Sequence, residues 1–470
     1  MNNKYLFHDT NIFLSSLSPK IIKKVYGDIN IQDIAENNFS SISELLIEVF
    51  GDYIIEIELN SNRIFISSSA CSLSFVYKDE IYSEEQMLSS KGYSSKYLKD
   101  IDDLGMSYAP KSHMFAEDVF ALFPATILVT NDKNFVQINS WLDILLDRPK
   151  DFSIHKMKRS LKKYFSDKKV YLLTSGGVDT ALLLDIFNDK DDICYVTYIF
   201  ERTGGNNTPN DAKRLLENIS KNKPYKHFIF HTENLHPVDK KIYEQDVDLD
   251  LMKRLELENE RVFVVSGQNS DSIVAPGFVK SDSVSSLFRN WGLKAGLKSA
   301  FINFMLVMFG STFTRIIFKF LLKPLEIFLR FYSNKILDYS IKGFYIGLFD
   351  TVPFIYSKKT NKKKILESYD QINSLFMNGL QNNSSSLTLL RIYSYSLYAM
   401  QNQRGVNTEG YKYILPFHSA YFIGFCLNRN FNLKNIWNPK KPIIDYLISN
   451  GMEKSFLFYS KDRETDDFKH

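Results

Sequence analysis

Alternating apolar and polar residues mark two hairpins in the first 150 residues of the chain. The segment Asp52–Ser68 contains the runs YIIEIEL and RIFISSS, which are separated by the polar turn NSN. The segment Ala125–Trp141 repeats this arrangement, with TILVT and FVQINSW on either side of NDKN. Alternation with a period of two, bounded by turn residues, is typical of strands in a sheet. The pattern therefore predicts an antiparallel sheet layer with helices, which forms one domain over residues 1–150.

Downstream of this domain, apolar runs alternate with helical segments. Short runs rich in β-branched and aromatic residues predict strands at 170–174, 193–200, 227–231 and 261–267. Between them, the sequences MKRSLKKYF, ALLLDIF and DAKRLLENI have the composition of helices. Strands that alternate with helices indicate βαβ units and a parallel sheet. We therefore expect an α/β domain over residues 151–470, with a helical C-terminal part at 365–470.

Residues 283–345 form an insertion in this domain that is rich in Phe and Leu and carries nine Lys or Arg against two acids. Its longest uncharged run, 299–314, is shorter than the roughly 18 residues of a spanning helix. From 315 to 330 the charged residues recur every three or four positions, on one face of a helix. Two interpretations stay open: helices packed on the α/β core, or an amphipathic helix touching the inner membrane surface. The lysine-rich segment 358–364 is either a solvated loop or a second contact with anionic lipid.

Composition and charge narrow the class of protein. The chain has 470 residues, and its 58 basic against 54 acidic side chains give a net charge of +4. This charge is too weak to predict nucleic acid as a partner. No segment near the start combines positive charge with an apolar core as a secretory signal does. The three cysteines lie far apart, which disfavours a disulfide framework and a zinc ribbon. These features favour a cytoplasmic protein.

The predicted strand at 170–174 is followed by the string SGGVDT and then by a helix. Two adjacent glycines let a backbone approach phosphate oxygens closely, and the following helix presents free N–H groups and the positive end of its dipole. The Ser and Thr add hydroxyl donors, and the Asp can hold the Mg²⁺ that bridges phosphate oxygens. A Gly-Gly turn alone is typical of many strand–helix connections, whereas the complete string predicts ATP and Mg²⁺ as ligands. The expected contacts are Thr174, Ser175, Gly176, Gly177, Val178, Asp179 and Thr180.

This string resembles the pyrophosphate-binding loop of the ATP pyrophosphatases, which adenylate a substrate oxygen and let a nucleophile displace AMP. The order of further motifs resembles the asparagine synthetases, in which a strand and an SGxGxDE string follow. Here VVSGQNSDS occupies that place. The resemblance implies that Asp271 is the second metal ligand and that Ser266 and Gly267 flank adenine. Gln268 stands at the position of the family's glutamate of the amide-forming step and is the catalytic candidate there, while Ser272 replaces the terminal glutamate. A glutamine does not transfer a proton as a carboxylate does.

Three later segments extend the resemblance. The string YILPFHS at Tyr413–Ser419 resembles the family's R-x-PFLD segment, which shapes the acceptor side of the cleft. Lys461 resembles the late lysine of an R-x-K-x-x-F motif, which implies that it stabilises charge developing at the α-phosphate. Lys441 resembles the lysine that opens the KxxLR helix, although a solvated surface lysine is the favoured interpretation.

The resemblance also reaches the N-terminal domain, where 51–55 and 64–74 are similar to the core hairpin of the family's glutaminase domain. In glutamine-dependent members the nucleophile is a cysteine directly after the initiator Met, and its amine is the base. Here Asn2 stands at that position, and Cys71 is interpreted as a small buried apolar residue. The domain therefore resembles a degenerate glutaminase of the N-terminal-nucleophile type, as in β-lactam synthetases and lasso-peptide cyclases.

Together these resemblances imply an ATP-dependent amide ligase. It would adenylate a small-molecule or peptide carboxylate and join it to an amine or ammonia, without glutaminase activity of its own. Two alternatives stay open: another ATP-pyrophosphatase-loop enzyme that modifies a nucleobase or tRNA, and a pseudoenzyme, which Gln268 and Ser272 favour. Keeping both predicted metal ligands disfavours the pseudoenzyme. A homodimer and a peripheral contact with the inner membrane surface stay open as well.

Overall fold

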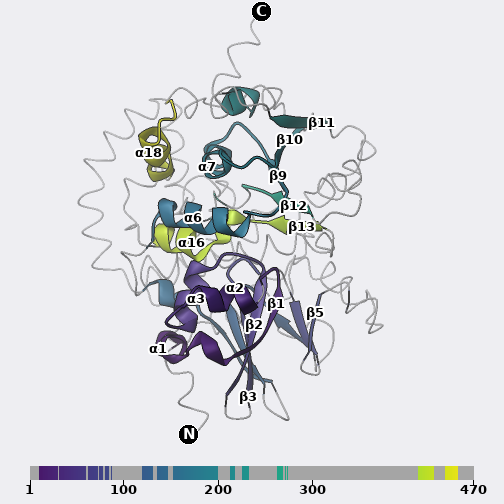
Figure 1. The fold of residues 1–470 in the computed structure, drawn as a ribbon, viewed down its shortest axis with the longest axis vertical. Helices are drawn as coiled ribbons and strands as arrows, with labels where there is room; N and C mark the ends of the chain where they lie inside the picture. The colour runs from purple at the N-terminus through teal and green to yellow at the C-terminus, as the bar shows by residue number, and fades with distance from the viewer. Residues whose placement is uncertain are drawn as a thin grey trace, which may run out of the picture.

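The computed structural model describes most of residues 10–199 and several shorter segments further along the chain (Figure 1). The described ranges are 10–29, 31–59, 62–71, 74–77, 80–83, 86, 119–130, 135–146, 152–199, 212–217, 225–231, 262–267, 270, 273, 411–427 and 440–453. The predicted insertion at 283–345 and the lysine-rich segment 358–364 lie outside these ranges. Within them, no helix is long and apolar enough to cross a membrane.

The N-terminal part of the chain contains two antiparallel sheets. The larger sheet has the strand order β1 (Ile22–Gly27), β2 (Tyr53–Leu59), β3 (Asn62–Ser67), β7 (Thr126–Thr130), β8 (Phe135–Ser140). The smaller sheet has the order β5 (Glu80–Ser83), β4 (Ser74–Tyr77), β6 (Val119–Leu122). Strand β2 pairs with β3 and β7 pairs with β8, both antiparallel, so both predicted hairpins are confirmed.

The alternation along β2 places one set of side chains on each face of the larger sheet. Ile55 and Ile57 belong to the main apolar core, together with residues of the short helices on that side. Ile54 belongs to a second cluster with Val76 and Leu122 of the smaller sheet. The larger sheet is therefore covered on both faces, by helices and by the smaller sheet. The short helices are α1 (Thr10–Ser16), η1 (Pro19–Ile21), α2 (Ile31–Glu36), α3 (Ile42–Glu48) and η2 (Leu142–Leu145).

The second part of the chain contains a five-stranded sheet in which every pair of neighbours is parallel. Its order is β11 (Lys226–His231), β10 (Ile193–Ile199), β9 (Val170–Leu173), β12 (Val262–Val265), β13 (Tyr411–Ile414). The predicted parallel sheet is thus confirmed. The chain winds outward from β9 in one direction through β10 and in the other through β12. The connections after β9 and β12 therefore diverge, and we expect the crevice in which such sheets bind ligands at the carboxyl ends of these two strands.

Four helices accompany the parallel sheet: α6 (Ile154–Tyr164), α7 (Val178–Phe187), α16 (Ala420–Leu427) and α18 (Lys441–Ser449). Helix α6 buries Met157 and Leu161 at helical spacing, and the Ser153 side chain caps its first turn. Helix α7 is buried on almost all sides and packs against both α6 and α18. Figure 1 shows α6 and α16 side by side between the N-terminal sheets and the parallel sheet, and α16 contacts both α6 and α3.

One sequence-based prediction was wrong in the C-terminal part. We expected helices joined by loops over 365–470, but Tyr411–Ile414 forms the edge strand β13 of the parallel sheet. Its sequence, YKYI, is too short to show a period, and its partner β12 lies far away in the chain. Helices α16 and α18 agree with the prediction. Strand β1 was also not predicted from the sequence, because two adjacent lysines interrupt the apolar residues of its IKKVYG run.

Candidate active site

The loop between β9 and α7 begins the candidate site. The Thr180 hydroxyl oxygen accepts a hydrogen bond from the Ser175 N–H at 3.2 Å and lies 2.9 Å from the Ser175 hydroxyl oxygen. Helix α7 starts after Gly177, which offers no side-chain cap to the first N–H groups. Ser175 and Gly177 are exposed. The uncapped helix start therefore presents its N–H groups and its positive dipole end at the carboxyl edge of the sheet.

Buried hydroxyl groups fix the start of this loop to strand β10. The Thr174 hydroxyl donates to the carbonyl of Val196 at 3.1 Å, and the Thr197 hydroxyl oxygen lies 3.0 Å from the carbonyl of Thr174. The Thr197 hydroxyl also lies 2.9 Å from Nε2 of His227 on the edge strand β11. Burial lowers the pKa of His227, with a smaller effect from Lys213. His227 thus supports the sheet, as expected of a structural histidine.

The connection after β12 lies directly against the loop after β9. A side-chain carbon placed on Gly267 would lie 3.6 Å from Cβ of Asp179 and 3.7 Å from the ring of Phe417. The Ser266 N–H donates to the carbonyl of Ile414 on β13 at 3.1 Å. The segments after β9, β12 and β13 therefore converge at one crevice. Gly267 therefore lies close to both Asp179 and Phe417.

A lysine contacts Asp179 from the start of α18. Nζ of Lys440 lies 2.5 Å from Oδ2 of Asp179, and both side chains are largely buried, at 22% and 16% exposed. The next residue, Lys441, pairs with Asp445 on the outer face of the same helix, where both side chains are more than half exposed. The favoured interpretation of Lys441 as a surface lysine is confirmed. Lys440 is the functional candidate that sequence reasoning missed.

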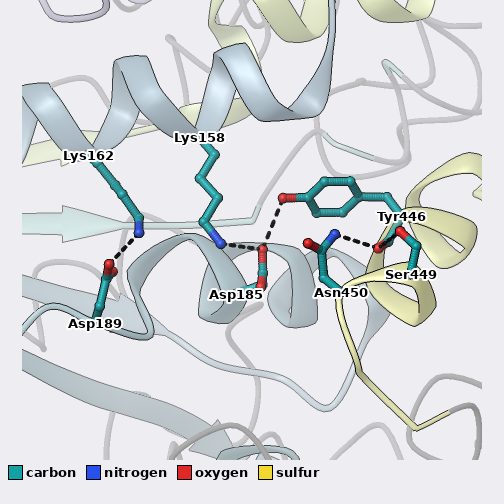
Figure 2. A network of polar contacts seen from close by, with 7 residues as sticks. All are labelled: Lys158, Lys162, Asp185, Asp189, Tyr446, Ser449 and Asn450. Atoms are coloured by element: carbon teal, nitrogen blue, oxygen red, sulfur yellow. Dashed lines mark hydrogen bonds and ion pairs between the residues drawn. The ribbon is translucent and has the colours of Figure 1, made fainter.

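A polar network holds α18 beside α7 (Figure 2). Oδ2 of Asp185 accepts from Nζ of Lys158 at 2.9 Å and from the Tyr446 hydroxyl at 3.3 Å. Burial, followed by the charge of Asp185 and this hydrogen bond, raises the pKa of Tyr446, so its hydroxyl stays a donor. Helices α6, α7 and α18 meet at this one carboxylate. The network therefore fixes the position of α18, from whose start Lys440 reaches Asp179.

The two lysines that α6 directs toward α7 allow a matched test of this network. The Lys158–Asp185 pair is largely buried. The Lys162–Asp189 pair also connects α6 with the α7 region (Figure 2), but its lysine side chain is 35% exposed and its aspartate side chain 63% exposed. Lys158→Met should lower the free energy of unfolding by about 2 kcal/mol, since it leaves the largely buried Asp185 carboxylate without its cation. Lys162→Met should cost about 0.5 kcal/mol. Urea denaturation measures the free energy of unfolding of both variants. An equal decrease in the two variants would contradict the assigned role of Asp185.

The segment after β13 is buried beneath the loops after β9 and β12. Phe417 and His418 are buried in a short 3-10 turn, η5 (Pro416–His418). Burial lowers the pKa of His418 to about 4, so the imidazole is neutral near pH 7. The ring centroids of Phe417 and Phe422 lie 4.7 Å apart. These contacts place Phe417 in the apolar core below the candidate site.

The buried cysteine of the N-terminal part shows no sign of a nucleophile. Cys71 is 2% exposed and belongs to the cluster between the two antiparallel sheets. Burial, together with the nearby negative charge of Asp52, raises the pKa of its thiol well above the usual value. A buried, protonated thiol is a poor nucleophile. The interpretation of Cys71 as a small buried residue is confirmed.

Most of the sequence-predicted site residues meet in this crevice. The structure places there Thr174, Ser175, Gly176, Gly177, Val178, Asp179, Thr180, Ser266 and Gly267. Gln268, Asp271 and Lys461 lie outside the described residues, so their roles stay predictions. Among the described residues, no three His, Cys, Asp or Glu side chains gather to hold a metal. Magnesium commonly takes only one or two protein carboxylates and completes its shell with phosphate oxygens and water, so Asp179 fits such a site.

Comparison with known proteins leaves the family open. No family model matches the chain, and no curated protein matches it. The resemblance to the asparagine synthetases therefore stays an expectation that rests on the motifs.

Proposed function

We propose that the protein is an ATP-dependent carbon–nitrogen ligase that adenylates a carboxylate, releases pyrophosphate and joins the acyl group to an amine or ammonia. One observation carries this proposal. The SGGVDT loop and the SG segment after β12 come together at the point where the strand order reverses, with Gly267 against Asp179. A glycine-rich loop that opens a helix at this place is suited to bind the phosphates of a nucleotide.

Each part of the crevice has a role in this chemistry. The backbone N–H of Gly176 and the N–H groups at the start of α7 would hold phosphate oxygens, with Ser175 and Thr180 as hydroxyl donors. Asp179 would hold Mg²⁺, which when bound neutralises charge on the phosphates. The neighbouring Ser266 and Gly267 would border the nucleotide. The segment Tyr413–Ser419 would lie on the acceptor side, on the basis of the resemblance alone.

Lys440 adds a positive charge that the motifs did not predict. Its Nζ pairs with Asp179 at 2.5 Å, and the Asp185 network keeps its helix in place. In this position it can stabilise the negative charge that grows on pyrophosphate as the α–β bond breaks. Lys461 is proposed for the neighbouring α-phosphate on the basis of the resemblance alone.

Isotope exchange between ATP and pyrophosphate tests the proposal without knowledge of the amine. Adenylation is reversible, so labelled pyrophosphate should enter ATP when a suitable small-molecule or peptide carboxylate is present. We expect exchange to depend on the carboxylate and on Mg²⁺, with AMP as the nucleotide product after an amine is added. Formation of ADP and phosphate in place of AMP and pyrophosphate would contradict the proposal.

Two adjacent lysines provide a sharp test of the site. Lys440→Met should slow carboxylate-dependent exchange by about a hundredfold, the usual loss when a group that stabilises developing charge is removed. Lys441→Met makes the same change one residue away, where the lysine forms an exposed pair with Asp445, and should leave the rate within about twofold. If Lys441→Met is the damaging change, the start of α18 is assigned incorrectly.

A further inference from the structure

The ion pair between Lys440 and Asp179 involves the carboxylate to which the proposed function assigns a metal ion. Nζ of Lys440 contacts Oδ2 of Asp179 at 2.5 Å. Asp179 lies in the first turn of α7, close after the two glycines of the loop. A carboxylate binds Mg²⁺ through the same oxygens that accept hydrogen bonds from an ammonium group. Lys440 therefore holds one of the two oxygens that a metal ion would use.

The other carboxylates of these two helices have cations of their own. Asp185 on α7 pairs with Lys158, and Asp445 on α18 pairs with Lys441. The pair at Asp179 is largely buried, whereas the pair at Asp445 is more than half exposed. Charges with little solvent contact are screened less than charges at the surface. The lysine charge therefore acts on Asp179 with little screening by water.

Lys440 has a second kind of acceptor within reach when phosphates bind. Its backbone is held in place, because α18 packs on α7 and Tyr446 contacts Asp185. Its side chain is a flexible four-carbon stem that ends in a compact charge. The start of α7, where the loop would hold phosphate oxygens, is also where the ammonium group lies. Exchange of the carboxylate for a phosphate thus needs only rotation of the lysine side chain.

We propose that Lys440 blocks the Asp179 carboxylate against metal and releases it only when nucleotide phosphates take over the lysine. This inference rests on the proposed function, which assigns the loop to a nucleotide and Asp179 to Mg²⁺. Two cations at one carboxylate repel each other, so Lys440 and a free metal ion compete for Asp179. Phosphates remove the competition, since they accept from Lys440 and add ligands for the metal. Metal then enters the site together with the nucleotide.

Titration of the full chain with Mn²⁺ alone, followed by the electron paramagnetic resonance signal of the free ion, tests the competition. Lys440→Gln should bind Mn²⁺ about tenfold more tightly than the unmodified chain, because a hydrogen bond between charged groups no longer opposes binding. Lys440→Met should show the same gain. Lys440→Arg keeps the charge and should bind as weakly as the unmodified chain. Lys441→Gln removes the neighbouring exposed charge and should change the affinity by less than about twofold.

Two results of the titration would overturn the proposal. One is equal affinity of Lys440→Gln and the unmodified chain. The other is a gain that persists in the double variant Asp179→Asn/Lys440→Gln, since the metal would then bind elsewhere. Because no nucleotide is present, either result is distinct from an absence of pyrophosphate exchange, which would count against the ligase.

Thermal unfolding gives a second measurement and shows whether each variant is folded. Mg²⁺ should raise the melting temperature of Lys440→Gln more than that of the unmodified chain, because a ligand that binds the folded state stabilises it. The metal would replace the cation that Asp179 has lost. Equal shifts of the two melting temperatures would contradict the competition.

Discussion

Asp179→Asn should abolish the exchange of pyrophosphate into ATP, with a loss of at least about a thousandfold. The change keeps the size of the side chain but removes the charge that would hold Mg²⁺ beside the phosphates, and metal-ion charge stabilisation is worth several kcal/mol. It also removes the ion pair with Lys440. The measurement is the initial exchange rate with a carboxylate that the unmodified chain accepts.

Asp189→Asn is the matched control for this variant. Asp189 follows the same helix, and its pair with Lys162 is exposed, so we expect an unchanged exchange rate. Circular dichroism of both variants separates loss of chemistry from loss of folding. Full exchange by Asp179→Asn would show that the SGGVDT loop does not act on ATP, and the assignment of the crevice would then be wrong.

Much of the architecture follows from patterns that are local in the chain. The hairpin of β2 and β3 can be predicted from the sequence because the turn residues NSN separate two alternating runs, and the position of that turn sets the register of the two strands. The parallel sheet can be predicted because strand patterns alternate with helix patterns along the chain. The loop after β9 can be predicted as a binding loop because Gly176 and Gly177 stand between an apolar strand and an apolar helix. In each case the physical cause acts within a few residues.

The features that the sequence did not reveal depend on distant contacts. The pair KK in PKKP gives no indication of which lysine turns inward. Helix α18 packs on α7 through the contact of Tyr446 with Asp185, and this packing determines which lysine turns inward. As a result, Lys440 contacts Asp179 and Lys441 faces outward. The edge strand β13 is equally hidden, because its pairing with β12 spans a long stretch of chain. Tertiary packing overrides weak local preference in such places.

Lys412→Met should lower the free energy of unfolding by about 3–5 kcal/mol, because it leaves a buried carboxylate without its cation. Nζ of Lys412 on β13 lies 3.2 Å from Oδ2 of Asp52, which precedes β2, and only 18% and 7% of the two side chains are exposed. The pair therefore joins the edge of the parallel sheet to the antiparallel sheet. The control is Lys23→Met, which breaks a pair with Glu58 whose side chains are 56% and 52% exposed and should cost less than about 1 kcal/mol.

The double variant Lys412→Met/Asp52→Leu distinguishes the loss of an attraction from the burial of an unpaired charge. With both charges removed, no group stays ionised in a site that excludes water, and apolar replacement of a buried pair is often neutral. We therefore expect the double variant to unfold at a higher urea concentration than Lys412→Met alone. The opposite order would mean that Asp52 is stabilised by other neighbours, of which the Cys71 thiol is the nearest candidate. Strand β13 continues into the turn at Phe417, which lies against Gly267, so the same variants should also slow pyrophosphate exchange if the junction positions Gly267.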